Sequence, residues 1–74
     1  MSRLGKITGR QLVAALSKAG FQLIRVRGSH HFMRHPDGRA TVVPMHAGES
    51  IGPGLLNKIL GDCDMGRDDL AAIL

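Results

Sequence analysis

The stretch FQLIRVRGSHHFMRHPDGRATVVP, residues 21–44, decides the fold of this 74-residue chain. It contains three short runs that are rich in β-forming residues and are separated by turn-forming residues. The runs are residues 21–26, 30–35 and 40–44. Between them lie RGS at residues 27–29 and PDGR at residues 36–39, whose residue types favour tight turns. Short connections of this kind join antiparallel neighbours, so the stretch predicts a three-stranded antiparallel meander.

A helix is predicted on each side of this meander. Residues 8–19, TGRQLVAALSKA, carry apolar side chains on one helical face, and Thr8 with Gln11 matches a capping box. Residues 53–60, PGLLNKIL, repeat the helical spacing, and residues 67–74, RDDLAAIL, predict a short C-terminal helix. The order is α-β-β-β-α followed by a short helix. The simplest way to bury both main helices lays them on one face of the sheet, which gives an α+β fold.

Length and composition predict one small cytoplasmic domain that spans residues 1–74. Hydrophobic residues make up 43% of the chain, which is enough for a globular core. No apolar run reaches the roughly 18–20 residues of a membrane span, and the N-terminal segment lacks the continuous apolar run of a signal peptide. Cys63 is the single cysteine, which excludes an internal disulfide and a cysteine-cluster zinc site.

Charge is distributed unevenly along the chain. Up to residue 60, nine Lys and Arg residues against two acids give a net charge of +7. From residue 61 onward, one Arg against four Asp residues gives −3. A basic body suits an anionic partner such as nucleic acid, although a basic solvated surface has the same composition.

Four histidines are the first candidates for chemistry. They are His30, His31, His35 and His46, and the first three fall within RVRGSHHFMRHP. Strand alternation places His31 and His35 on one face of the sheet and His30 on the other. Because no carboxylate or cysteine has the spacing that would complete a tetrahedral site, we expect no metal.

Nucleophilic catalysis is disfavoured by the context of each nucleophile. Ser29 and Ser50 lack the surroundings of a nucleophile elbow. Cys63 lies between Asp62 and Asp64, whose negative charges raise a thiol pKa and so reduce its reactivity.

Acid–base chemistry on RNA remains open. RNA can be cleaved by its own 2′-OH if one group removes a proton, one group delivers a proton, and cations stabilise the phosphorane; histidine suits such proton transfers near pH 7. His30 directly follows a Gly-Ser turn at the start of a strand, and Arg25, Arg27 and Arg34 lie nearby in sequence. A basic strand without any catalytic role fits the same residues, so the spacing alone leaves both interpretations open.

Several segments resemble the HicA toxin family of mRNA interferases. They are LVAALSKAGF, RGSHH, RHPDGR, VPMH and PGLLNKIL, and the resemblance covers roughly residues 8–74. It implies a fold like that of a double-stranded-RNA-binding domain and ribosome-independent cleavage of mRNA without a metal or a small-molecule cofactor. It also implies a HicB-type antitoxin that covers the catalytic face and neutralises the toxin. The chain departs from ordinary double-stranded-RNA-binding domains in its last main helix, where Lys58 is the sole basic residue.

The resemblance also suggests roles for individual residues. The family's catalytic histidine corresponds to His30, and its essential glycine corresponds to Gly28. We expect Ser29 beside them, and Arg25, Arg27 and Arg34 as phosphate contacts, to complete the substrate site. The alternative is a non-catalytic RNA-binding or protein-interaction module with the same fold, in which replacing His30 would have little effect.

Overall fold

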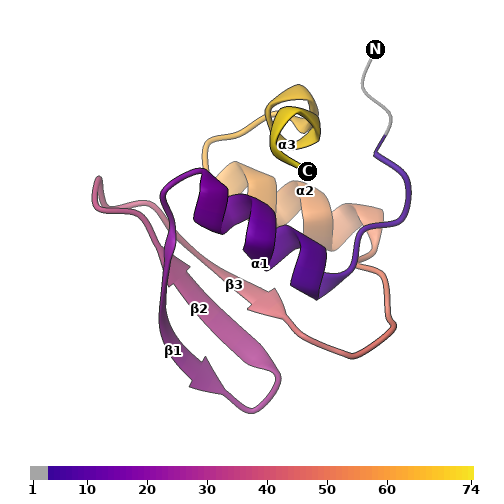
Figure 1. Ribbon diagram of the computed structural model, residues 1–74, viewed down its shortest axis with the longest axis horizontal. Coiled ribbons are helices and arrows are strands. Elements are labelled where there is room, and N and C mark those ends of the chain that lie inside the picture. The colour runs from indigo at the N-terminus through magenta and orange to yellow at the C-terminus, as the bar shows by residue number, and fades with distance from the viewer. Residues whose placement is uncertain (1–3) are drawn as a thin grey trace.

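The computed structural model describes residues 4–74, which form a three-stranded sheet and three helices (Figure 1). In chain order the elements are α1 (Gly9–Lys18), β1 (Gln22–Arg27), β2 (His30–Arg34), β3 (Ala40–Pro44), α2 (Pro53–Asp62) and α3 (Arg67–Ile73). This order confirms the predicted α+β class, similar to a double-stranded-RNA-binding domain, with a short helix at the C-terminal end. None of the helices in the described residues is long and apolar enough to cross a bilayer.

The sheet is the predicted antiparallel meander, with the strand order β1-β2-β3. Its two turns contain Gly28 and the PDGR segment, as predicted, but β1 begins and ends one residue later than predicted, so Arg27 belongs to the strand and not to the turn. The second strand is one residue shorter than predicted, because β2 ends at Arg34. The His35 N–H donates to the carbonyl of Arg39 at 2.8 Å, and the Gly38 N–H donates to the carbonyl of His35 at 2.9 Å, so His35 belongs to the turn.

Helix α1 begins at the predicted capping box. The Gln11 N–H donates to Thr8 Oγ1 at 3.2 Å, and the Thr8 N–H donates to Gln11 Oε1 at 2.9 Å. These bonds satisfy two N–H groups that the helix itself leaves without partners. The apolar face of α1 then buries Leu12 and Leu16, both fully shielded from solvent.

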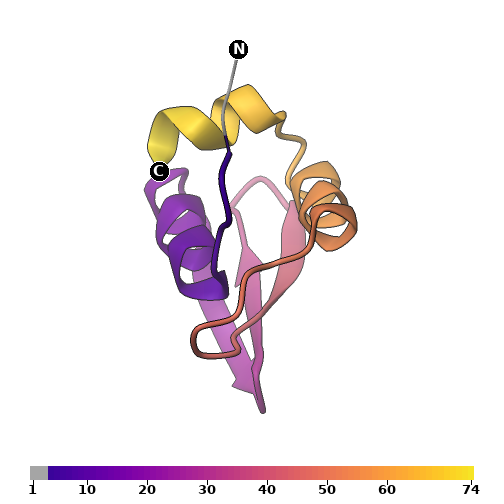
Figure 2. The ribbon, with the colours of Figure 1, turned by 90° about the vertical axis from the view of Figure 1, so that its right-hand side faces the viewer.

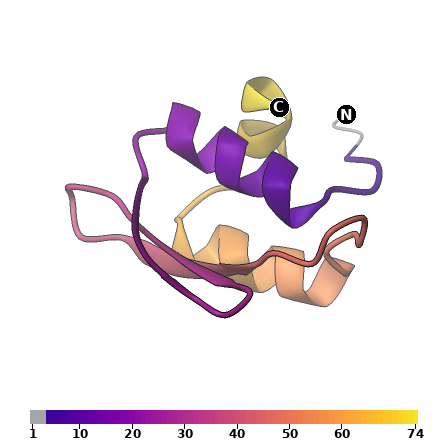
Figure 3. The ribbon, with the colours of Figure 1, turned by 60° about the horizontal axis from the view of Figure 1, so that its bottom comes forward.

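The helices enclose one hydrophobic core against the sheet. Helix α1 crosses one face of the sheet, whereas α2 lies along the edge strand β3 (Figure 3). Helix α3 lies across the ends of both, on the side away from the β1–β2 turn, and contributes Leu70 to the core (Figure 2). Met33 and Val43 are the fully buried side chains of the sheet, so their face is the inner face of the sheet.

Two polar contacts fix α2 beside β3. Thr41 Oγ1 donates to Asp62 Oδ2 at 3.0 Å, and Arg39 Nη1 donates to the carbonyl of Cys63 at 2.5 Å. Thr41 is only 5% exposed, so its hydroxyl needs this partner to remain satisfied in the interior. The contacts hold the C-terminal end of α2 against the edge strand β3.

Candidate functional site

The pairing of the strands decides which side chains share the outer face with His30. Arg27 and Pro44 are the cross-strand partners of His30, and Phe32 is paired with Arg25 and Val42. Directly opposed residues of a sheet point to the same side. The outer face therefore carries Arg25, Arg27, His30, Phe32, Arg34, Ala40, Val42 and Pro44.

A β-bulge in β1 brings the arginines to this face. The register shifts between Leu23, which is paired with Met33, and Arg25, which is paired with Phe32. Regular alternation from Leu23 would turn Arg25 and Arg27 toward the inner face. The extra residue, Ile24, reverses that alternation, as a bulge does. Both arginines thus lie on the same face as His30.

The predicted site residues are grouped at one end of the sheet, with one exception. His30 is exposed at the start of β2, directly opposite Arg27. Arg34, at the other end of β2, lies four residues from His30, which is roughly 13 Å along a strand. Arg25 and Arg27 can therefore act next to His30, whereas Arg34 can reach only a distant part of a bound chain.

The β1–β2 turn holds Gly28 and Ser29 beside His30. Gly28 has a φ of +58°, a conformation that side-chain-bearing residues seldom adopt, and no atom lies within 4 Å of the position that a Cβ would occupy. The carbonyl of Ser29 accepts a hydrogen bond from the Met45 N–H at 2.6 Å, which extends the β2–β3 ladder into the turn. The turn is thus hydrogen-bonded at Ser29 to the chain that follows β3, whereas the space beside Gly28 is unoccupied.

A groove runs between the outer face and α2. We call it the outer groove; its volume is about 450 Å³. It is lined by Ile24, His30, Phe32, Met33, Ala40, Thr41, Val42, Pro44, Leu55, Lys58, Ile59 and Asp62. His30 lies at the end near the β1–β2 turn, and most of the remaining wall is apolar. Phe32 was not predicted as a site residue, although its position two residues after His30 on a strand places both side chains on one face.

One lysine and one aspartate line the outer groove, and Arg25 lies beside it on the sheet. The guanidinium of Arg25 lies over the ring of Phe32, 4.6 Å from its centroid, which is a cation–π contact. Across the groove, Lys58 Nζ lies 3.2 Å from Asp62 Oδ2. Asp62 also accepts the Thr41 hydroxyl, so the one carboxylate that lines the groove within the described residues is already engaged.

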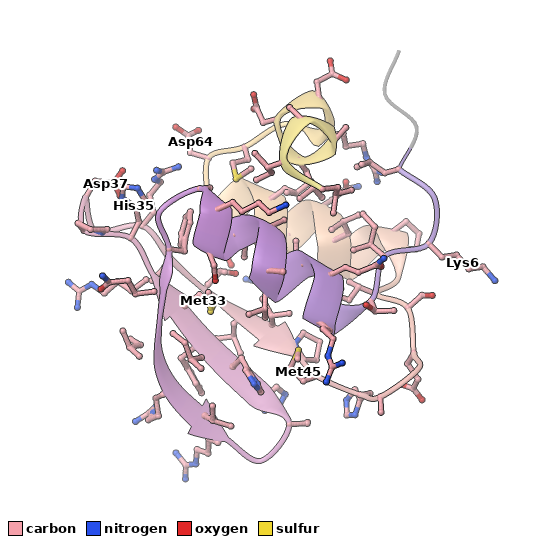
Figure 4. The ribbon with its side chains drawn as sticks, viewed as in Figure 1. Lys6, Met33, His35, Asp37, Met45 and Asp64 are labelled. Carbon is pink, nitrogen blue, oxygen red and sulfur yellow. The ribbon has the colours of Figure 1, made fainter. Side chains whose placement is uncertain are left out.

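The other histidines have different surroundings. His31 is paired with Val26 and Val43 on the inner face, and its Nδ1 is buried without a hydrogen-bond partner in the described part of the chain. His35 lies at the β2–β3 turn beside Asp37 (Figure 4), where its ring packs edge-on against Phe21 at 5.2 Å between centroids. His35 Nδ1 accepts the Asp37 N–H at 3.1 Å, so this histidine has a structural role.

Cys63 is buried at the end of α2, where its surroundings disfavour a nucleophilic role. Burial raises the pKa of its thiol to about 11, and the negative charge of Asp62 adds to the increase. The thiolate is therefore scarce near neutral pH. Across residues 4–74, no three His, Cys, Asp or Glu side chains are grouped as ligands for a metal ion.

Comparison with known proteins identifies the family. A comparison with curated proteins gave no match. A family model described as the HicA toxin of bacterial toxin–antitoxin systems matches residues 9–65, which includes both main helices, the whole sheet and the His30 turn. This match covers most of the chain, and the chain belongs to the HicA toxin family.

Proposed function

We propose that the chain is a toxin that cleaves mRNA in the cytoplasm, without a metal or the ribosome, and that His30 is its catalytic residue. Membership of a toxin family supports a toxic activity of this kind. The observation that carries the proposal is the juxtaposition of His30 with Arg27 on an exposed sheet face, next to the open turn at Gly28.

The chemistry is a transfer of the phosphoryl group within the RNA. The 2′-oxygen attacks phosphorus and forms a P–O2′ bond, while the P–O5′ bond breaks. One proton leaves the 2′-OH and one proton reaches the departing 5′-oxygen, so the products are a 2′,3′-cyclic phosphate and a 5′-OH end. His30 carries out one of these two transfers, which is the role of a general acid or base.

The arginines next to His30 stabilise the charge that develops on the phosphate. Guanidinium groups bind phosphate oxygens through paired, charge-assisted hydrogen bonds. Arg27 lies opposite His30, and Arg25 lies opposite Phe32 two pairs further along the sheet. Free space above Gly28 lets the RNA backbone approach this group of side chains.

A HicB-type antitoxin neutralises the toxin by covering the outer face. Three exposed apolar side chains that line the outer groove provide surface for such a partner; they are Ile24, Val42 and Leu55. The basic body of the chain adds attraction for an acidic partner. Covering the outer face excludes RNA from His30 without any change in the fold of the toxin.

The test uses purified protein, excess EDTA and a short RNA, together with the same RNA carrying one 2′-deoxynucleotide at the cleaved position. We expect the RNA to be cut in EDTA and the deoxy-substituted RNA to stay intact at that position. Loss of cleavage in EDTA, or cleavage of the deoxy-substituted bond, would overturn the proposed chemistry. A folded protein that binds RNA and never cuts it would favour the non-catalytic RNA-binding module instead.

A further inference from the structure

The outer groove contains features that the transfer of a phosphoryl group does not require. Its wall beyond His30 is formed by the ring of Phe32 and by the apolar side chains of Val42 and Leu55, which are 36% and 41% exposed. We infer that this groove binds one unpaired nucleobase, stacked on Phe32, so that the RNA is single-stranded at the cleaved bond. The inference rests on the proposed RNA cleavage and adds the part of the substrate that the groove recognises.

The pairing of Phe32 with Arg25 forms a stacking surface. Phe32 is half-buried, and the Arg25 guanidinium lies over its ring at 4.6 Å from the centroid. Proteins that bind single strands commonly stack bases on aromatic rings and on arginine planes, because every base has a flat π-face. Such contacts do not depend strongly on which base is bound.

The position of Phe32 relative to His30 suits one nucleotide. The two residues are separated by one intervening residue of β2, on the same face of the sheet, which is roughly 7 Å along the strand. A base on Phe32 therefore places its own sugar and phosphate near His30 and Arg27. The groove volume of about 450 Å³ is within the range of small-ligand sites.

Charge around the groove favours nucleic acid as the occupant. Arg25 and Arg27 lie beside the groove as the cross-strand partners of Phe32 and His30, which line it, and Lys58 lines the groove from α2. The negative charge of Asp62 is offset by Lys58 at 3.2 Å and by the hydroxyl of Thr41. A side chain of a partner protein is the competing occupant, and binding measurements on variants of the groove distinguish the two.

A base within a duplex cannot fill the groove, because its flat faces are covered by its neighbours. Double-stranded RNA is bound mainly through phosphates and 2′-hydroxyls across the minor groove. Helix α2 provides a single cation for such contacts, Lys58. The apolar groove and the shortage of cations on α2 both favour a single strand over a duplex.

The experiment measures binding of a short RNA that carries the fluorescent base 2-aminopurine at successive positions. The His30→Gln protein serves as the background, so that the RNA stays intact. Replacing Phe32 by Leu removes the ring and keeps an apolar side chain; we expect binding to weaken roughly 5- to 150-fold, as the loss of one stacked base predicts. Quenching of 2-aminopurine at one position should disappear with it, and Phe32→Tyr should restore both.

A second variant tests the same groove in case Phe32→Leu does not fold. Leu55→Ala changes the opposite wall at a side chain that is 41% exposed, so the core is not disturbed. It should also weaken binding of the single strand. A duplex of the same sequence should bind the background protein more weakly than the single strand, and Phe32→Leu should reduce that difference.

The outcomes separate this inference from the proposed function. If the wild-type protein cuts RNA but Phe32→Leu binds the single strand as tightly as the background protein, the base-binding inference is wrong and the cleavage proposal stands. If the wild-type protein neither binds nor cuts RNA, both fall. If Phe32→Leu keeps RNA binding and loses antitoxin binding, the groove is a protein-docking site and the inference is overturned.

Discussion

Replacing Gly28 distinguishes two possible requirements for a glycine in the β1–β2 turn, which are a positive φ and open space for the RNA backbone. Its φ of +58° disfavours residues with a Cβ, whereas the open space above it allows one sterically. A left-handed conformation costs an ordinary residue about 1–2 kcal/mol. For a domain of this size, each kcal/mol lowers Tm by about 4–8 °C. We therefore expect Gly28→Ala to melt roughly 4–16 °C below the wild type, and Gly28→Asn to lose less, because asparagine tolerates this conformation.

Cleavage should respond differently from stability. The Asn side chain occupies the space through which the phosphate is proposed to approach, so Gly28→Asn should cut RNA on the order of 100-fold more slowly, the effect of a displacement of about 1 Å at a reacting group. Melting is followed by circular dichroism, and cleavage is followed under single-turnover conditions at a temperature where each variant is folded.

Gly38 provides the matched control. It also has a positive φ, +101°, with no atom within 4 Å of the place where a Cβ would lie, and it belongs to the turn at the opposite end of β2. Gly38→Ala should lose stability and keep its cleavage rate. If Gly28→Asn cuts RNA at the wild-type rate, the phosphate does not need the open space beside Gly28. If Gly28→Ala has the wild-type Tm, the positive φ of Gly28 does not disfavour a residue with a Cβ.

Three further predictions concern the fold and its charges. Met33→Ala empties a fully buried position and should destabilise the protein by about 2–5 kcal/mol in urea unfolding; a loss below about 1 kcal/mol would contradict its place in the core. Cys63 should resist alkylation at pH 8 while the protein is folded and react once it is unfolded, because burial raises its pKa to about 11; rapid labelling of the folded protein would show that the thiol is accessible. Asp37 accepts a hydrogen bond from the Arg39 N–H at 3.0 Å, which lowers the pKa of the Asp37 carboxyl below 3.8. The contribution of this ionised carboxylate to stability should therefore be present at neutral pH and be lost as the pH falls through the lowered pKa. An NMR titration of Asp37 with a midpoint at or above 3.8 would contradict this prediction.

The features that the sequence predicts well are those that depend on local chemistry. The capping box of Thr8 and Gln11 marks the start of α1, and the PDGR turn marks the connection between β2 and β3. Hydrophobic spacing predicts the apolar faces of α1 and α2. The predicted second strand extends one residue too far, to His35. The His35 N–H instead donates to the carbonyl of Arg39 and closes the turn, and β-forming propensity alone does not predict this hydrogen bond.

The candidate site depends more on contacts between distant residues. His30 can be selected from the sequence because it follows a Gly-Ser turn, and His31 can be assigned to the other face by alternation. The position of Arg25 and Arg27 beside His30 depends on the bulge at Ile24, which carries no glycine or other local signal. The outer groove exists because Thr41 and Asp62, far apart in sequence, hold α2 against β3.

The cleavage rates of His30→Gln and His31→Gln, compared in one assay, test the central claim most directly. The two residues are adjacent in the chain and have the same side chain, but they lie on opposite faces of the sheet. If His30 transfers a proton during cleavage, His30→Gln should cut RNA about 10²–10⁴-fold more slowly than the wild type while remaining folded and able to bind RNA. Folded His31→Gln should cut within a few-fold of the wild type. A folded His30→Gln that cuts at the wild-type rate would contradict the assignment of His30 as the catalytic residue.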